Sequence, residues 1–230
     1  MTTTFLSKPY FKKRFFAIFI PLFAFLLCAL TACKSKMDYT AYISELRSNI
    51  LLAETEEFSL RVYAVEKEIP YVADGIPREK TTRLEAYLQA PEGNQTCQLF
   101  FKFDDREFHG EMSYDNVKAE YFFSCTLDVS EAVSLPCRIE YGDKQVEMSA
   151  QSVRSANTLS AKGVLSLLET SEPELFASMT DKYGFTGEIY IRLICEDSPY
   201  YYVGIIDRNG TVNAFLINAQ SGKILAKRTT

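Results

Sequence analysis

Apolar and polar residues alternate along the middle of the chain, starting near Glu56. Phe58, Leu60, Val62 and Ala64 are separated by single polar or amphipathic residues, and this period of two is typical of a strand with one buried face. The same alternation returns near residues 82–90, 96–104, 107–114, 118–127, 135–141 and 144–150. These short strands predict an antiparallel, immunoglobulin-like β-sandwich over residues 56–150.

The pattern before the sandwich differs. Between residues 38 and 50 the apolar positions recur at helical spacing after Asp38, a residue suited to begin a helix (Tyr39, Tyr42, Ile43, Leu46 and Ile50). We therefore expect residues 33–55 to form a tether and a helix that packs on the sandwich.

The pattern after the sandwich changes again. Residues 151–158 are polar and predict a linker. Residues 159–230 then show two short helical patterns, followed by strand patterns at 187–195, 200–206, 211–217 and 223–227. Asn209-Gly210 is a strong hairpin signal between two of those strands. The order predicts a small α+β domain with helices on one face of an antiparallel meander.

The start of the chain has the parts of an export signal. The basic residues Lys12-Lys13-Arg14 precede an apolar run from Phe15 to Leu30, which ends in Leu30-Thr31-Ala32-Cys33. The last four residues resemble the lipobox of bacterial lipoproteins, an aliphatic residue, a small residue, Gly or Ala, and Cys. The resemblance implies that residues 1–32 are a signal peptide and that Cys33 carries the lipid.

Two other interpretations of this segment stay open. The apolar run contains Pro21 and falls short of the roughly 20 residues that a membrane span needs, so an uncleaved anchor is one alternative and ordinary cleavage is another. A lipid on Cys33 implies a protein anchored to the cell membrane on its extracytoplasmic side. The whole arrangement resembles small uncharacterised lipoproteins of Gram-positive bacteria.

The end of the chain resembles a second family. The strand Tyr202 to Ile206, the turn at 207–210 and the stretch Ala214 to Leu225 are similar to the closing hairpin of PepSY-like domains. Asn218 stands where that family usually has Asp, and Ser221 where it has Thr. The resemblance implies an exported or envelope protein that binds or restrains a peptidase. A plain hairpin is the alternative.

Charge limits the class of partner. Of the 25 basic residues four precede Cys33, and none of the 30 acidic residues does, so the mature chain has a formal net charge of −9. Proteins that bind nucleic acid rely on Lys and Arg for most of their affinity. We therefore expect no nucleic-acid partner.

Four cysteines remain after the signal and the lipobox. Cys97, Cys125, Cys137 and Cys195 are each in phase with an apolar strand face, which favours buried thiols that act as small hydrophobic residues. Disulfides are the alternative in an exported protein. Cys97 with Cys137 is the pair to test.

Residues suited to catalysis or metal binding are sparse. His109 is the single histidine, and with Glu107 and Glu111 it shares one strand face, which could hold a metal but is also what a solvated strand shows. The pair Asp104-Asp105 lacks the rest of a calcium loop, and no Gly-x-Ser-x-Gly elbow occurs. We expect neither an enzyme nor a cofactor.

Aromatic residues are the remaining candidates for a site. Tyr200, Tyr201 and Tyr202, and the outward-phased Phe100 and Phe122, are more apolar than a solvated face requires. Aromatic residues are enriched at protein interfaces, so Tyr200–Tyr202 are predicted as an interaction patch. Packing between the two domains is the alternative for all of them.

Three classes of function fit these observations. The sequence favours a non-catalytic surface lipoprotein that binds a protein, a peptide or a cell-wall component. A solute-binding lipoprotein of a transporter is less favoured, because strands here follow strands instead of alternating with helices. An envelope hydrolase is the third class, and the single histidine disfavours it.

Overall fold

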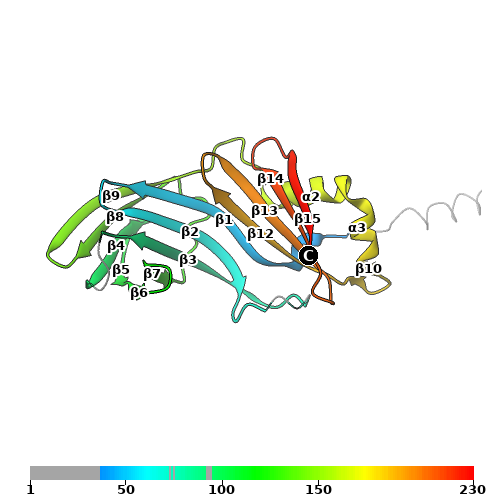
Figure 1. Ribbon diagram of the computed structural model, residues 1–230, viewed down its shortest axis with the longest axis horizontal. Helices are drawn as coiled ribbons and strands as arrows, with labels where there is room; N and C mark the ends of the chain where they lie inside the picture. The colour runs from blue at the N-terminus through cyan, green and yellow to red at the C-terminus, as the bar shows by residue number, and fades with distance from the viewer. Residues whose placement is uncertain (1–36, 73, 75, 92–94) are drawn as a thin grey trace, which may run out of the picture. The chain divides into compact units, whose positions relative to one another are not determined.

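The computed structural model describes residues 37–72, 74, 76–91 and 95–230, and Tyr39–Thr230 form one compact unit (Figure 1). Its first part holds the 3-10 turn η1 (Tyr39–Tyr42) and the strands β1 (Ile43–Glu54), β2 (Ser59–Glu68), β3 (Lys80–Gln89), β4 (Cys97–Phe103), β5 (Arg106–Glu111), β6 (Ser113–Asp115), β7 (Glu120–Cys125), β8 (Ser134–Tyr141) and β9 (Lys144–Ser152). Its second part holds the helices α2 (Ala161–Ser171) and α3 (Pro173–Ser178) and the strands β10 (Thr180–Asp181), β11 (Gly184–Phe185), β12 (Glu188–Cys195), β13 (Pro199–Ile206), β14 (Val212–Asn218) and β15 (Ile224–Thr229).

One long sheet joins the two parts, in the order β15-β14-β13-β12-β1-β2-β3-β7-β6. Its neighbouring strands are antiparallel except β1 and β12, which run parallel. The parallel pair is possible because a long crossover separates β1 from β12 in the chain. Figure 1 shows β1 as the strand at which the first and second parts meet.

A β-bulge divides β1 between two neighbours. Before the bulge at Arg47–Asn49, β1 pairs with β12, and after it Leu51 and Leu52 pair with β9. From β9 the pairing continues through β8 and β4 to β5, which makes a second layer. The predicted β-rich α+β fold, with an antiparallel sandwich-like arrangement, is confirmed.

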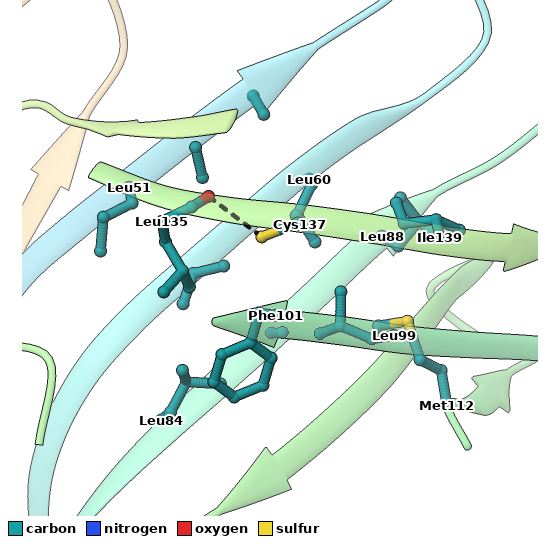
Figure 2. Packing of buried hydrophobic residues seen from close by; sticks show 14 of the residues in the cluster. Leu51, Leu60, Leu84, Leu88, Leu99, Phe101, Met112, Leu135, Cys137 and Ile139 are labelled. Atoms are coloured by element: carbon teal, nitrogen blue, oxygen red, sulfur yellow. Dashed lines mark hydrogen bonds between the residues drawn. The ribbon is translucent and has the colours of Figure 1, made fainter. Parts of the chain in front are cut away.

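The first hydrophobic core fills the space between the two layers. Leu60 and Leu84 of the long sheet and Leu99 and Leu135 of the second layer are at most 1% exposed and belong to one cluster (Figure 2). Burying a side chain of this size contributes about 2 kcal/mol to folding. Burial of one face of each strand in this core therefore explains the alternation of apolar and polar residues in the sequence.

The four cysteines among the described residues are free thiols, and Cys97 and Cys137 are buried in this first core. The suggested bridge between these two is wrong. In the β4–β8 register Cys97 is opposite Tyr141 and Cys137 is opposite Phe101, which puts the two cysteines four residues, or about 13 Å, apart along the strands. A disulfide requires Cα atoms within about 7 Å.

A second core lies under the two helices. Val164 and Leu168 of α2 and Phe176 of α3 pack on Ile191 and Val203 of the meander. Ser160 caps α2, because its Oγ accepts a hydrogen bond from the Gly163 backbone N–H at 3.1 Å. The predicted order of two helices and a meander is confirmed, and so is the Asn209-Gly210 hairpin, with Gly210 at φ 83°.

The helix predicted between Asp38 and Ile50 is wrong, because this segment is the short turn η1 followed by β1. The bulge breaks the alternation of β1, and the strand lies between two cores. Ile50 belongs to the second core and its neighbour Leu51 to the first. Burial on both faces removes the period of two and leaves a spacing that imitates a helix.

Candidate interaction surface

A row of aromatic and arginine side chains crosses one face of the long sheet. We call this set the aromatic–arginine row. It consists of Phe122 on β7, Tyr87 on β3, Tyr63 on β2, Arg47 on β1, Arg192 and Tyr190 on β12, and Tyr202 on β13.

Strand alternation places the row on the face opposite the neighbouring core residues, although Tyr63 also packs against the second core beside its register partner Ile50. Tyr63 lies between Val62 and Ala64, which both point into the first core. Tyr190 likewise lies between Ile189 and Ile191, which both belong to the second core. Successive side chains of a strand point to opposite faces, so the row shares one face of the sheet, on which Tyr190 is 8% exposed and the other row residues are half-buried.

The rings of the first half of the row touch one another. The ring centroids of Phe122 and Tyr87 are 5.0 Å apart, and those of Tyr87 and Tyr63 are 5.6 Å apart. Arg47 then lies over Tyr63, with its Cζ 4.1 Å from the ring centroid. Contacts of this kind contribute about 0.5 to 1.5 kcal/mol each, and they hold the side chains in fixed positions.

The second half of the row begins beside Arg47, because Arg47 is opposite Arg192 in the β1–β12 register. Arg192 lies over Tyr190 at 4.7 Å, and the Tyr190 and Tyr202 centroids are 5.8 Å apart. A Cβ at Gly204 would come within 2.0 Å of the Tyr190 ring. The lack of a side chain at Gly204 therefore leaves the space that the Tyr190 ring occupies.

Most charges beside the row are paired. Arg61 binds Glu120 at 2.6 Å, and Lys67 binds Glu85 at 2.5 Å. Arg47 differs: among the described residues it has no ion pair, and its Nε is buried without a hydrogen-bond partner. A carboxylate from outside the chain could pair only with the terminal nitrogens of this guanidinium, because its Nε is buried.

Burial changes the acidity of the aromatic hydroxyls near the row. Desolvation, and after it the neighbouring Glu85 carboxylate, raise the pKa of Tyr87 well above its ordinary value. Desolvation also raises the pKa of Tyr190. Both phenols therefore stay neutral at physiological pH and act as hydrogen-bonding groups, not as bases.

The predicted patch Tyr200–Tyr202 is divided between the two faces of the sheet. Tyr201 is 2% exposed in the second core, and its hydroxyl donates a hydrogen bond to the Leu159 carbonyl at 2.6 Å. Tyr201 is therefore not a surface residue, which corrects that part of the prediction. Tyr202 belongs to the aromatic–arginine row, and Tyr200 is half-buried on the same strand.

The two outward phenylalanines also have different surroundings. Phe122 belongs to the row, whereas Phe100 lies on the outer face of the second layer. There the stacked rings of Phe100 and His109 have centroids 5.6 Å apart, and the Arg138 Cζ lies 4.1 Å from the Phe100 centroid. The sequence interpretation missed Tyr63, Tyr87 and Arg47. Their shared outward phase was the available signal.

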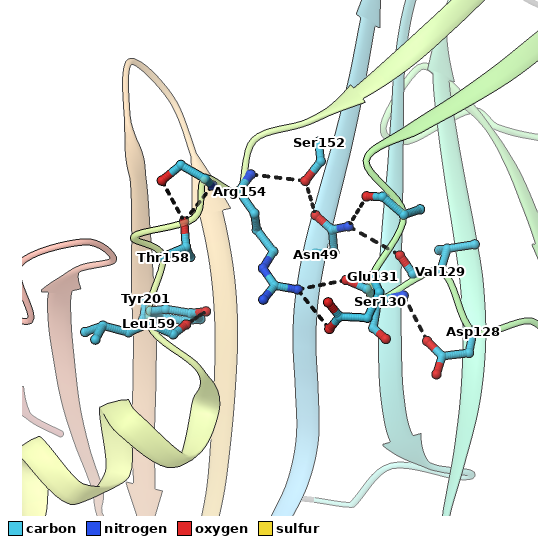
Figure 3. Close-up of polar contacts among 12 residues, drawn as sticks. Asn49, Asp128, Val129, Ser130, Glu131, Ser152, Arg154, Thr158, Leu159 and Tyr201 are labelled. Atoms are coloured by element: carbon cyan, nitrogen blue, oxygen red, sulfur yellow. Dashed lines mark hydrogen bonds and ion pairs between the residues drawn. The ribbon is translucent and has the colours of Figure 1, made fainter.

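A small cavity lies where the linker passes over the sheet, and Figure 3 draws some of its lining residues, among them Ser130, Glu131 and Arg154. It encloses about 240 Å³ between the loop that precedes β8 and the start of α2. Arg154 crosses it and donates from Nη1 to the Ser130 carbonyl at 2.8 Å and to the Glu131 carboxylate at 3.3 Å. Small-molecule sites usually hold about 300 to 1,000 Å³, so this cavity is small for an organic solute.

The residues considered for metal binding lie on an exposed edge of the second layer. Glu107, His109 and Glu111 are all exposed on β5, and Asp104 and Asp105 form the β4–β5 turn with φ of 48° and 60°. In the part of the chain that the structure describes, no group of three or more His, Cys, Asp or Glu is arranged to hold a metal ion. None of its helices is long and apolar enough to cross a membrane.

Cys33, the predicted site of lipid attachment, lies outside the described residues. Comparisons of the chain with known protein families, with curated proteins and with solved structures found no match. The lipobox and PepSY-like resemblances therefore stay predictions from the sequence. The chemistry of the aromatic–arginine row is the remaining guide to the function of the folded body.

Proposed function

We propose that the chain is a lipid-anchored lipoprotein of the cell membrane that faces the extracytoplasmic side. Residues 1–32 would be its signal peptide, and Cys33 would carry the lipid. The support is the sequence order of a basic segment, an apolar run and a lipobox-like Cys. Two acyl chains on one residue anchor a protein stably, whereas a single chain is marginal.

We further propose that the body is a non-catalytic binding module for an extracytoplasmic protein or peptide. The observation that carries this proposal is the aromatic–arginine row. Tyr and Arg are the residue types that most often dominate the energy of protein interfaces, and here they are held in place by one another. The unpaired Arg47 in the middle of the row favours a partner that offers a carboxylate.

The other two classes have less support. The 240 Å³ cavity lined by Arg154 is smaller than the sites that usually hold an organic solute. A hydrolase would depend on His109, which stacks on Phe100 on an exposed strand. An immunoglobulin-like sandwich and a PepSY-like hairpin would both be consistent with a binding role, and the PepSY-like resemblance would make a peptidase the first partner to test.

The anchor is tested by labelling cells with palmitate. The wild-type chain should incorporate the label, and Cys33→Ala should lose it. Cys28→Ala is the matched control, because Cys28 lies in the same apolar segment but before the lipobox. Equal labelling of Cys33→Ala and wild type would contradict lipidation at Cys33.

The binding surface is tested by capture of envelope proteins or peptides with the mature chain. Tyr63→Ser/Tyr87→Ser removes two adjoining rings of the row, and Arg47→Gln removes its unpaired charge. Phe100→Ser is the matched control, because Phe100 also lies on an outer strand face but on the other layer. A partner that is lost with the row variants and kept with Phe100→Ser supports the proposal, provided that circular dichroism shows each variant folded. A partner lost with none of them contradicts it.

A further inference from the structure

Exposed apolar side chains gather at one end of the body. Ile69, Val72 and Ile76 are 52%, 44% and 54% exposed, and all three lie in the segment that joins β2 to β3. Tyr183, 85% exposed, lies at the turn between β10 and β11. Apolar groups that cluster on a surface usually mark a contact with a protein or a membrane.

The pairing registers show that these segments share one end of the long sheet. Glu68 at the end of β2 is opposite Lys80 at the start of β3, so the joining segment lies beyond this pair. The start of β1 is beside the start of β12, because Ile43 is opposite Ile189, and the β10–β11 hairpin immediately precedes β12. In Figure 1 the joining segment, the turn after β13 and this hairpin lie along the lower edge of the body.

The joining segment is also tied to the body at this end. The Arg78 backbone N–H donates to the carboxylate of Glu68, which is 1% exposed, and the Arg78 side chain pairs with Asp74 at 2.5 Å. Tyr71 interacts with both Glu188 and Ser44. Burial, and after it the charge of Glu188, raises the pKa of Tyr71 to about 12. The described residues Tyr71 and Arg78, which flank Val72 and Ile76 in the sequence, are therefore held against the body.

The chain enters the body at the same end. The Tyr39 ring contacts Phe176 at 4.7 Å and Phe185 at 5.1 Å between centroids, and Phe185 is the last residue of the β10–β11 hairpin. Cys33 precedes Tyr39 by six residues, which span at most about 21 Å when fully extended. A lipid on Cys33 would therefore hold this end of the body close to the membrane surface.

The side chains at this end have the chemistry of a membrane interface. The Lys182 Nζ lies 4.7 Å from the centroid of the Tyr183 ring. Aromatic rings favour the level of the lipid headgroups, and a lysine next to them can extend its ammonium group toward anionic headgroups. In the sequence, Lys34 and Lys36 add two more cations to the tether.

We propose that this end of the body docks on the bilayer that carries the anchor, with Val72, Ile76 and Tyr183 at the depth of the headgroups. The inference rests on the membrane-anchored lipoprotein of the proposed function, and it adds a second contact with the same membrane. The lipid holds the chain at the surface, and the docked end fixes the orientation of the body.

The absence of tryptophan from the chain makes the test direct. The full chain is expressed in cells, purified with its lipid and reconstituted into vesicles of phosphatidylcholine and phosphatidylglycerol. Val72→Trp, Ile76→Trp and Tyr183→Trp each introduce one fluorophore at the proposed contact. Val117→Trp and Val133→Trp are the matched controls, because these residues are 95% and 77% exposed in other loops.

Brominated lipids report whether each tryptophan meets the bilayer. Docking predicts blue-shifted emission from the three probes and quenching by about twofold or more, because rings at headgroup depth lie beside the upper part of the acyl chains. The two controls should keep the emission of a tryptophan in water. Unquenched probes overturn the proposal, and so does a blue shift without quenching, which would show contact with protein instead of lipid.

Mass spectrometry of the same preparations separates this proposal from the anchor. An acylated chain with unquenched probes contradicts docking and leaves the anchor intact. A chain without the lipid whose probes are nevertheless quenched contradicts the anchor and supports docking. Unquenched probes in a chain without the lipid contradict both.

Discussion

Arg192 and Glu45 form a two-bond ion pair across the parallel junction of β12 and β1. The Arg192 Nε donates to Glu45 Oε1 at 2.9 Å, and its Nη2 donates to Glu45 Oε2 at 2.5 Å. Burial lowers the pKa of Arg192, but the hydrogen bond and charge of Glu45, together with the neighbouring Tyr71 and Tyr190, raise it above its ordinary value. The pair therefore joins the two parts of the chain at the point where the long sheet is continuous.

Glu45→Gln should lower the free energy of unfolding by about 2 to 3 kcal/mol, because it leaves the partly buried Arg192 without its counter-charge. Urea unfolding of the purified chain measures this. Glu57→Gln is the control, because Glu57 pairs with Lys144 at 2.7 Å with both side chains about half exposed, and we expect a change within about 0.5 kcal/mol. Equal effects of the two substitutions would contradict the assigned role of the Arg192 pair.

Asn49→Ala should cost about 2 to 4 kcal/mol of stability. Asn49 is 1% exposed, and it donates to the carbonyls of Val129 and Ala132 at 3.3 and 2.9 Å while accepting from Ser152 Oγ at 2.7 Å (Figure 3). The substitution removes the Asn49 partner of all three groups, although the Val129 carbonyl still accepts from the Ala132 N–H at 3.2 Å and Ser152 Oγ still accepts from the Arg154 N–H at 3.1 Å. Ser152→Ala removes only one of these bonds and should cost about 1 kcal/mol in the same urea experiment. A loss no larger for Asn49→Ala than for Ser152→Ala would refute this explanation.

Gly204→Ala should displace the Tyr190 ring from the aromatic–arginine row and destabilise the fold by about 1 to 3 kcal/mol. The reason is the 2.0 Å approach of the added Cβ to that ring. Gly163→Ala in α2 is the opposite control, because the nearest atom to its added Cβ is 3.4 Å away and alanine favours a helix by about 0.5 to 1 kcal/mol. The midpoint temperature of thermal unfolding should be lower for Gly204→Ala than for the wild type, and higher for Gly163→Ala.

Stability should fall at alkaline pH. Burial raises the pKa of Cys97 and of Cys137 to about 12, whereas a thiol in the unfolded chain titrates near 8.5, roughly. Above that pH the unfolded state loses protons that the folded state keeps, so each thiol lowers the free energy of unfolding by up to about 1.4 kcal/mol per pH unit until about pH 12. Cys97→Ala/Cys137→Ala should make the decline between pH 8 and pH 10 shallower. An unchanged slope would contradict a contribution from these thiols.

The sequence was informative wherever one strand face meets one core. Leu60, Val62 and Ala64 alternate because only one side of β2 is buried in the first core. The sequence misled at β1, where Ile50 and Leu51 enter different cores. No periodicity in a single segment reports that a strand will be covered on both sides by distant parts of the chain.

The candidate surface was predictable only in part. Tyr202 and Phe122 could be named from their aromatic character and phase, but Tyr201 was included because neighbouring tyrosines look alike in a sequence. Arg47 and Tyr63 come together across two strands at 4.1 Å, and that contact depends on a register which the bulge shifts. Cross-strand pairs of this kind become visible only when the order of the sheet is known.

Site-specific photo-crosslinking in living cells tests the central claim most directly. A photoreactive phenylalanine analogue replaces Tyr87 or Tyr202 in the aromatic–arginine row, or Gln145 on the exposed β9 as a control. The binding-module account predicts a discrete adduct of one envelope protein or peptide from both row positions, none from Gln145, and loss of the adduct with Arg47→Gln. No adduct from either row position, or the same adduct from Gln145, would contradict the account.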